Sequence, residues 1–108
     1  MAGLLLAIAI AAEVAATLLL RQSYGFTRLL PSLGVCAGYG LAFYSLSLAL
    51  REIELGTAYA IWSGAGTAII FGIGMLFLGE SSSPLKIASI VFIIIGVAGL
   101  NVIGGRPA

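Results

Sequence analysis

Long apolar runs alternate with short polar segments along the whole chain. Charged side chains gather in the polar segments: residues 1–20 hold one charge, and residues 29–50, 55–79 and 87–105 hold none. A helix needs about 20 residues to cross a hydrocarbon core of about 30 Å. The pattern therefore predicts four transmembrane helices, at about 2–22, 29–50, 55–79 and 85–105.

The segments that connect these runs are short. They read RQSYGFTR, REIE and ESSSPLK, and tight connections make consecutive helices antiparallel. Pro31 and Pro84 fall in the expected first turns of the second and fourth helices, where a missing N–H costs little. Apolar and polar residues do not alternate as they would in a β-barrel. The prediction is an all-α membrane protein, with one four-helix domain over residues 1–108.

Composition agrees with a membrane protein and excludes several other classes. Hydrophobic residues make up 61% of the 108 residues, whereas a soluble domain of this size needs polar side chains to cover its surface. The net charge is +1 and no basic cluster occurs, so nucleic acid is not an expected partner. His is absent and Cys36 is the single cysteine, which leaves no metal-ligand set and no disulfide framework.

Basic residues are nearly balanced between the two sides of the predicted membrane. One side holds Arg21, Arg28 and Lys86, and the other holds Arg51, Arg106 and the N-terminal amine. The excess of Lys and Arg that fixes orientation is therefore missing. This balance predicts dual topology, in which the chain inserts in both orientations.

Glu13, in the run AIAIAAEVAATLLL, is the one acid or base at membrane depth. An acidic side chain at the centre of a bilayer costs about 2.5–3.5 kcal/mol, so it should face the protein interior or a wet cavity. No Lys, Arg or His lies at similar depth. Its counter-charge must come from a proton, a bound cation or hydroxyl groups of other helices. The alternative is a structural Glu that is hydrogen-bonded across helices.

Residues three, four or seven positions from Glu13 share its helix face. Small Ala9 and Ala16 leave room beside the acid, and Thr17 can supply a hydroxyl group. Simple packing of small residues between helices is the alternative for this face. The residues of the stripe are Leu6, Ala9, Ile10, Ala16, Thr17 and Leu20.

Aromatic residues form a second candidate cluster. Tyr59, Trp62 and Ser63 share one face of the third predicted helix, and Tyr39 lies deep in the second. Aromatic rings attract cations most strongly where water is excluded. We therefore interpret these residues as the lining of a cation site, whereas Tyr24, close to a span end, is typical of an interfacial belt.

Small residues form two further candidate features, one in each of the last two spans. Gly64 and Gly66 can form a bending point of the third helix, or they can allow close helix packing. Ser89 and Gly96 lie seven residues apart on one face of the fourth helix, which indicates a contact with another subunit.

Three segments together resemble the small multidrug resistance family of bacterial inner-membrane antiporters: AEVAATLLLRQSYGFTRLLPS, GTAYAIWSGAGT and SIVFIIIGVAGLN. The resemblance implies an antiparallel homodimer, or a heterodimer with a paired homologue, whose two membrane Glu residues bind protons or a cationic substrate in turn. Glu13 matches that acid. The other matches are the site aromatics Tyr39, Tyr59 and Trp62, then Ser63, the bend at Gly64 and Gly66, and the dimer stripe from Ser89 to Val97, which includes Gly96 and has Ser89 where the family more usually has Gly.

The resemblance also favours one branch of the family. The guanidinium-exporting branch typically has Trp and Ser where this chain has Ala16 and Ala42. We therefore expect a proton-coupled antiporter that exports hydrophobic and quaternary ammonium cations across the bacterial inner membrane. It is not expected to be an enzyme, and it needs no cofactor beyond the coupling proton. A guanidinium exporter and an accessory subunit of a paired transporter are the two alternatives.

Overall fold

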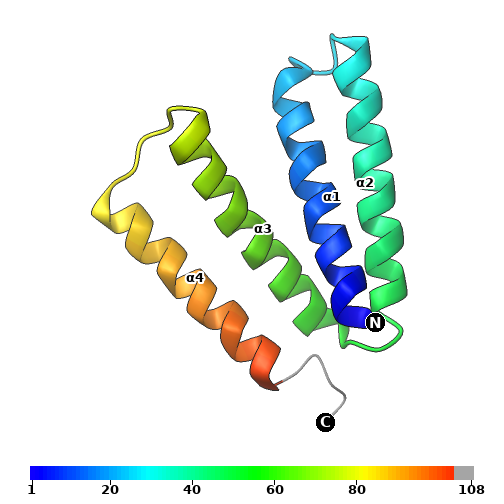
Figure 1. The fold of residues 1–108 in the computed structure, drawn as a ribbon, viewed down its shortest axis with the longest axis vertical. Coiled ribbons are helices and arrows are strands. Elements are labelled where there is room, and N and C mark those ends of the chain that lie inside the picture. Colours follow the sequence, from blue (N-terminus) through cyan, green and yellow to red (C-terminus); the bar gives the residue numbers. More distant parts are fainter. Residues whose placement is uncertain (104–108) are drawn as a thin grey trace. The chain divides into compact units, whose positions relative to one another are not determined.

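Four helices account for most of residues 1–103, the part of the chain that the computed structural model describes (Figure 1). Each is long and apolar enough to cross a membrane, and no strand occurs among the described residues. The predicted fold class is therefore confirmed. The helices are α1 (Ala2–Gln22), α2 (Leu29–Ala49), α3 (Leu55–Phe77) and α4 (Pro84–Ile103). The expected end of the last helix at 105, and Arg106, lie outside the described residues.

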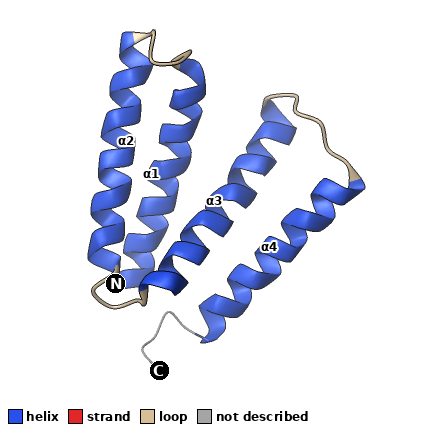
Figure 2. Ribbon diagram, turned by 180° about the vertical axis from the view of Figure 1, so that it is seen from behind, coloured by secondary structure: helices blue, strands red, loops and turns tan. Residues whose placement is uncertain are grey.

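The helices form two compact units, Met1–Arg51 and Glu52–Ala108. The first unit contains α1 and α2, which run antiparallel and are joined by a short loop. The second contains α3 and α4, also antiparallel (Figure 2). Tight loops thus produce the helix hairpins that the short polar segments predicted.

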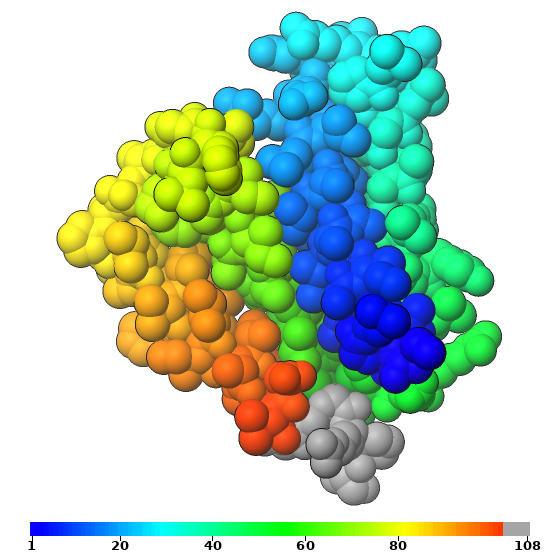
Figure 3. Space-filling model, in the orientation of Figure 1, coloured from blue at the N-terminus to red at the C-terminus, as the bar shows by residue number. Residues whose placement is uncertain are grey.

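Small residues bring α1 and α2 close together in the first unit. A Cβ atom on Gly38 would lie 2.7 Å from the Cβ of Ala16 and 3.3 Å from the carbonyl oxygen of Ala12, so only glycine fits here without a shift of the helices. Ala16 and Ala42 have no exposed surface. Side chains of the two helices meet along the pair in the space-filling view (Figure 3). The absence of bulk allows close backbone approach, as is common between membrane helices.

Ser23 organises the loop between α1 and α2 and is fully buried. Its hydroxyl donates to the carbonyl oxygen of Leu20 at 2.8 Å and accepts from the N–H of Phe26 at 3.1 Å. Tyr24, Gly25 and Phe26 all have positive φ angles, which turn the chain sharply. The serine therefore caps the end of α1 and fixes the reversal into α2.

The loop of the second unit is fixed at both ends. Gly79 adopts φ +71° just after α3, and the N–H of Glu80 donates to the carbonyl oxygen of Gly74 at 3.0 Å. Pro84 is the first residue of α4. The hydroxyl of Ser83 accepts from the N–H of Lys86 at 3.2 Å, the usual role of a residue that caps a helix start.

The side chains of α4 remain open to the surroundings. No residue from 84 to 102 is buried, and the helix lies at the surface in the space-filling view (Figure 3). Gly64 of α3 packs closely against α4: a Cβ there would lie 2.6 Å from Cγ2 of Val97 and 3.3 Å from Cγ2 of Ile93. The α3 helix continues without interruption through this point.

Candidate functional site

Glu13 lies near the middle of α1 and is half-buried. The hydroxyl of Thr17 donates to its Oε2 atom at 2.8 Å. Thr17 follows Glu13 by four residues, so the two side chains stand one above the other on the same face of the helix. The threonine therefore gives the carboxylate a fixed hydrogen-bond donor within its own helix.

A second hydroxyl extends this arrangement across to α2. The Tyr39 hydroxyl lies 2.7 Å from Oγ1 of Thr17. A threonine hydroxyl has one hydrogen, and Thr17 gives it to Glu13, so Tyr39 is the donor in this second bond. The result is a chain of two hydrogen bonds, from Tyr39 to Thr17 to Glu13, which we call the Glu13 chain. It links the acid of α1 to the neighbouring helix.

The close packing of α1 and α2 explains why these hydroxyls meet. Gly38 and Ala16 form the tight contact between the helices, and the adjacent residues Tyr39 and Thr17 form the hydrogen bond. A side chain larger than hydrogen at Gly38 would push the helices apart and lengthen that bond. The small residues therefore set the register that the Glu13 chain requires.

No fixed cation accompanies Glu13. Among the residues from 1 to 103, none forms an ion pair with it, and its hydrogen-bond partner is the Thr17 hydroxyl. The described basic side chains lie at helix ends and in loops instead: Arg21, Arg28, Arg51 and Lys86. Within the same residues, no group of three His, Cys, Asp or Glu side chains could hold a metal ion. Within the described residues, the acid is thus held by the Thr17 hydroxyl, which Tyr39 holds in turn.

The aromatic residues of α3 form a separate group in the second unit. The rings of Tyr59 and Trp62 meet edge to face, with centroids 5.6 Å apart. Trp62 is buried, whereas Tyr59 is 56% exposed. The hydroxyl of Ser63 donates to the Tyr59 carbonyl oxygen at 2.7 Å, a bond within the helix. Tyr59 thus offers an open ring that the buried indole of Trp62 supports.

The remaining predicted site residues are less clearly grouped. Leu6 and Ala9 are buried and Ile10 is half-buried. Gly64 lies at the contact with α4, and α3 is a continuous helix through Gly64 and Gly66. Ser89 and Gly96 are exposed on α4, and the Ser89 hydroxyl donates to the Leu85 carbonyl oxygen at 2.8 Å. The bending point and the subunit contact stay predictions.

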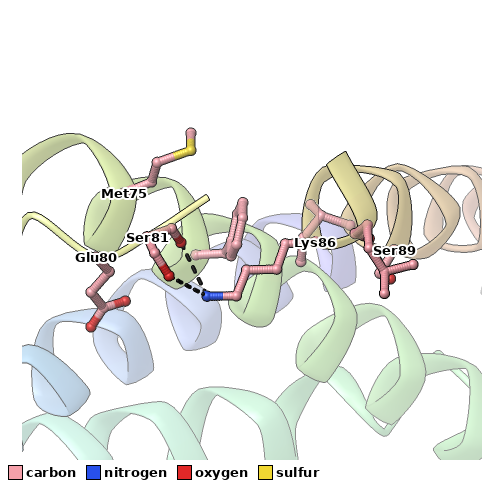
Figure 4. Close-up of a pocket in the computed structure, with 8 residues that line it drawn as sticks. Met75, Glu80, Ser81, Lys86 and Ser89 are labelled. Atoms are coloured by element: carbon pink, nitrogen blue, oxygen red, sulfur yellow. Dashed lines mark hydrogen bonds between the residues drawn. The ribbon is translucent and has the colours of Figure 1, made fainter. Parts of the chain in front are cut away.

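A pocket of about 350 Å³ in the second unit was not predicted from the sequence. It lies where α3 ends and α4 begins, and Glu80, Ser81 and Lys86 are among its lining residues (Figure 4). The signal was present in ESSSPLK, where an acid and a base flank three serines. Its length and polarity alone predict a connection between helices and no pocket.

Comparison with known proteins supplies a family and several similar chains. The model of the family described as Small Multidrug Resistance protein matches residues 1–103. Quaternary ammonium compound-resistance protein QacF of Klebsiella aerogenes is 48% identical over 98 residues, which cover 91% of this chain and 89% of the relative. QacE of Escherichia coli is 47% identical over 105 residues, or 97% and 96% of the two chains. Multidrug resistance protein Mmr of Mycobacterium tuberculosis is 45% identical over 99 residues, or 91% and 92%.

Proposed function

This chain belongs to the small multidrug resistance family and is a multi-pass membrane protein, and we propose that it exports hydrophobic and quaternary ammonium cations in exchange for protons across the bacterial inner membrane. The names of two relatives, which refer to quaternary ammonium compound resistance, support the substrate class. The single observation that carries the proposal is the Glu13 chain: a carboxylate at membrane depth that hydroxyl groups hold and no fixed cation neutralises.

The two hydrogen bonds of the Glu13 chain can form whether Glu13 is ionised or protonated. A carboxylate accepts from Thr17, which in turn accepts from Tyr39. When Glu13 takes a proton it gains a donor, so it can donate to Thr17, and Thr17 can then donate to Tyr39. Both hydrogen bonds survive while their direction reverses. Loading and unloading a proton therefore keeps both bonds of the Glu13 chain, while the hydroxyl hydrogen of Tyr39, a half-buried side chain, turns away from Thr17.

A lipophilic cation can replace the proton at the same acid. Its charge pairs with the Glu13 carboxylate, and its apolar groups lie against aromatic rings. A cation over a Tyr or Trp face is stabilised by about 2 kcal/mol or more when water is excluded. The half-buried ring of Tyr39, in the same unit as Glu13, is suited to this contact, and the resemblance to the family implies that Tyr59 and Trp62 also contact the substrate.

Competition for one acid is enough to produce exchange. Proton and cation each neutralise Glu13, and coupling follows if the loaded transporter changes its open side more readily than the empty, charged one. Each elementary charge that moves down a potential of 100 mV releases about 2.3 kcal/mol. We include in this proposal an antiparallel homodimer or a pair with a homologue, the contact along Ser89 and Gly96, and a bend at Gly64 and Gly66.

Two alanines favour bulky cations over guanidinium. Ala16 and Ala42 stand where the guanidinium-exporting branch carries Trp and Ser, and neither has exposed surface. In that branch such donors would help hold the carboxylate that pairs with a small planar cation. Without such donors, the hydroxyl groups of Thr17 and Tyr39 are the polar partners near the acid.

Reconstitution of the purified full-length chain in liposomes tests the proposal. We expect a pH gradient to drive tetraphenylphosphonium transport by the unmodified chain. Glu13→Gln should reduce transport to the level of empty liposomes, because it cannot exchange a proton. Glu13→Asp should transport slowly, because its carboxylate is about 1.5 Å further from Thr17.

Glu52→Gln is the matched control, since Glu52 is an exposed acid outside the helices, and it should transport normally. Robust proton-driven transport by Glu13→Gln would refute the assignment of the acid. Transport of guanidinium alone would favour the alternative exporter, and transport of neither cation would favour an accessory subunit.

A further inference from the structure

The pocket of the second unit is lined by residues of the polar loop and of the two helices that the loop joins (Figure 4). Phe71 lies six residues before the end of α3, and Ile90 lies six residues after the start of α4. At a rise of about 1.5 Å per residue, both reach about 9 Å below the helix ends. Met75 and Leu85 complete this apolar wall. The apolar wall therefore continues for about two helical turns away from the loop.

The loop end of the pocket carries two charges of opposite sign. The Lys86 ammonium donates to the carbonyl oxygen and the hydroxyl oxygen of Ser81, at 3.1 and 2.9 Å (Figure 4). The carboxylate of Glu80 instead lies against Gly74, in the space that a Cβ there would need. Within residues 1–103 neither charge forms an ion pair. An ammonium group has three donors, so Lys86 retains one for a ligand.

We propose that this pocket binds the headgroup of a zwitterionic phospholipid that carries a phosphate and a primary ammonium group, as phosphatidylethanolamine does. The phosphate lies beside Lys86 and the hydroxyl of Ser81, and the lipid ammonium lies beside Glu80. Its glycerol and upper chains contact Phe71 and Met75. A volume of about 350 Å³ is at the low end for ligand pockets, enough for a headgroup and not for whole acyl chains.

Charge balance distinguishes this headgroup from other phospholipids. Glu80 and Lys86 give the pocket no net charge, so an anionic lipid would leave the Glu80 carboxylate unneutralised beside a second negative group. A choline headgroup is zwitterionic but has no N–H to donate to Glu80. Of these headgroups, only the one with a primary ammonium can donate to Glu80 while its phosphate pairs with Lys86. This inference rests on the second unit alone and is independent of the transport mechanism.

Native mass spectrometry of the purified full-length chain tests the proposal, with phosphatidylethanolamine, phosphatidylglycerol and phosphatidylcholine of identical acyl chains offered in equal amounts. We expect phosphatidylethanolamine to be retained about fivefold better than the others, a difference typical of one part-exposed charge contact. Lys86→Gln should weaken retention of both phosphatidylethanolamine and phosphatidylglycerol. Glu80→Gln should lose the preference and retain more phosphatidylglycerol, because Lys86 is then unopposed.

Matched substitutions in the loop between α2 and α3 control for charge alone. Arg51 and Glu52 are exposed and do not line the pocket, so Arg51→Gln and Glu52→Gln should leave the lipid order unchanged. Circular dichroism checks that every variant keeps its helices. Equal retention of the three lipids by the unmodified chain, or a preference for phosphatidylglycerol, would overturn the proposal. Displacement of lipid by equimolar soluble phosphoethanolamine would identify a site for a free metabolite instead.

Discussion

Thr17 is the residue on which the geometry of the acid depends, because it takes part in both bonds of the Glu13 chain. Thr17→Val keeps the shape of the side chain and removes its hydroxyl. The carboxylate then loses a donor and Tyr39 loses its acceptor. We expect the affinity for tetraphenylphosphonium to fall about tenfold, as for one hydrogen bond to a charged group. Isothermal titration calorimetry in detergent at a fixed pH measures this change.

Two further variants separate the hydroxyl from the packing. Thr17→Ser keeps the hydroxyl and should retain most of the affinity. Tyr39→Phe removes only the second bond, so its effect should be smaller, and Thr17→Val with Tyr39→Phe should bind no more weakly than Thr17→Val alone. Additive losses in the double variant would show that Tyr39 acts on the cation independently of Thr17.

At the scale of elements, the contact between α1 and α2 depends on Gly38. A Cβ there would meet the Cβ of Ala16 and the Ala12 carbonyl oxygen, neither of which can rotate away. Gly38→Ala should therefore separate the helices and destabilise the first unit by about 1–3 kcal/mol. Reversible unfolding in sodium dodecyl sulfate, followed by circular dichroism, measures this loss. Gly40→Ala is the control, because nothing lies within 4 Å of its Cβ position, and an equal loss there would contradict the packing role.

Substitutions at Gly64 distinguish the two interpretations of the glycines in α3, which are a bending point and close helix packing. Gly64→Ala would bring its Cβ to 2.6 Å from Cγ2 of Val97, so we expect transport to fall in either case. Val97→Ala removes that methyl group. If Gly64 serves as a bending point, as we propose, Gly64→Ala with Val97→Ala should stay defective in liposome transport while regaining stability. Recovery of transport in the double variant would assign Gly64 to helix packing alone.

The helices were predictable because the charges divide the chain into spans of the right length. Their ends depend on local chemistry that hydropathy does not report: α3 ends at Phe77, before the left-handed Gly79, and not at 79. The contact of Thr17 with Glu13 follows from their spacing in one helix. The bond of Thr17 to Tyr39 does not, because the register between two helices depends on the fit of Gly38 against Ala16. The periodicity of the sequence identifies which residues share one face of a helix, but not which residues of another helix that face contacts.

At the scale of the whole molecule, the proposed antiparallel dimer needs copies of the chain that are inserted in opposite orientations. The basic residues permit this, because Arg21, Arg28 and Lys86 oppose Arg51, Arg106 and the N-terminal amine. A single substitution should therefore bias insertion. Arg51→Gln should favour chains with the C-terminus outside, and Arg28→Gln should favour the reverse. The ratio of alkaline phosphatase to fluorescent-protein activity in C-terminal fusions measures orientation, and signal from only one reporter in the unmodified chain would contradict dual topology.

The same two variants test whether both orientations are needed for one function. Each biased chain alone should give weak resistance to a quaternary ammonium compound, because it has few oppositely oriented partners. Expressed together, Arg51→Gln and Arg28→Gln chains supply each other with those partners, so resistance should return to nearly the unmodified level at matched expression. Neither substitution changes the Glu13 chain, and each purified variant should still bind tetraphenylphosphonium after reconstitution, where insertion is not guided by charge. Full resistance from either biased chain alone would instead support a transporter whose copies share one orientation.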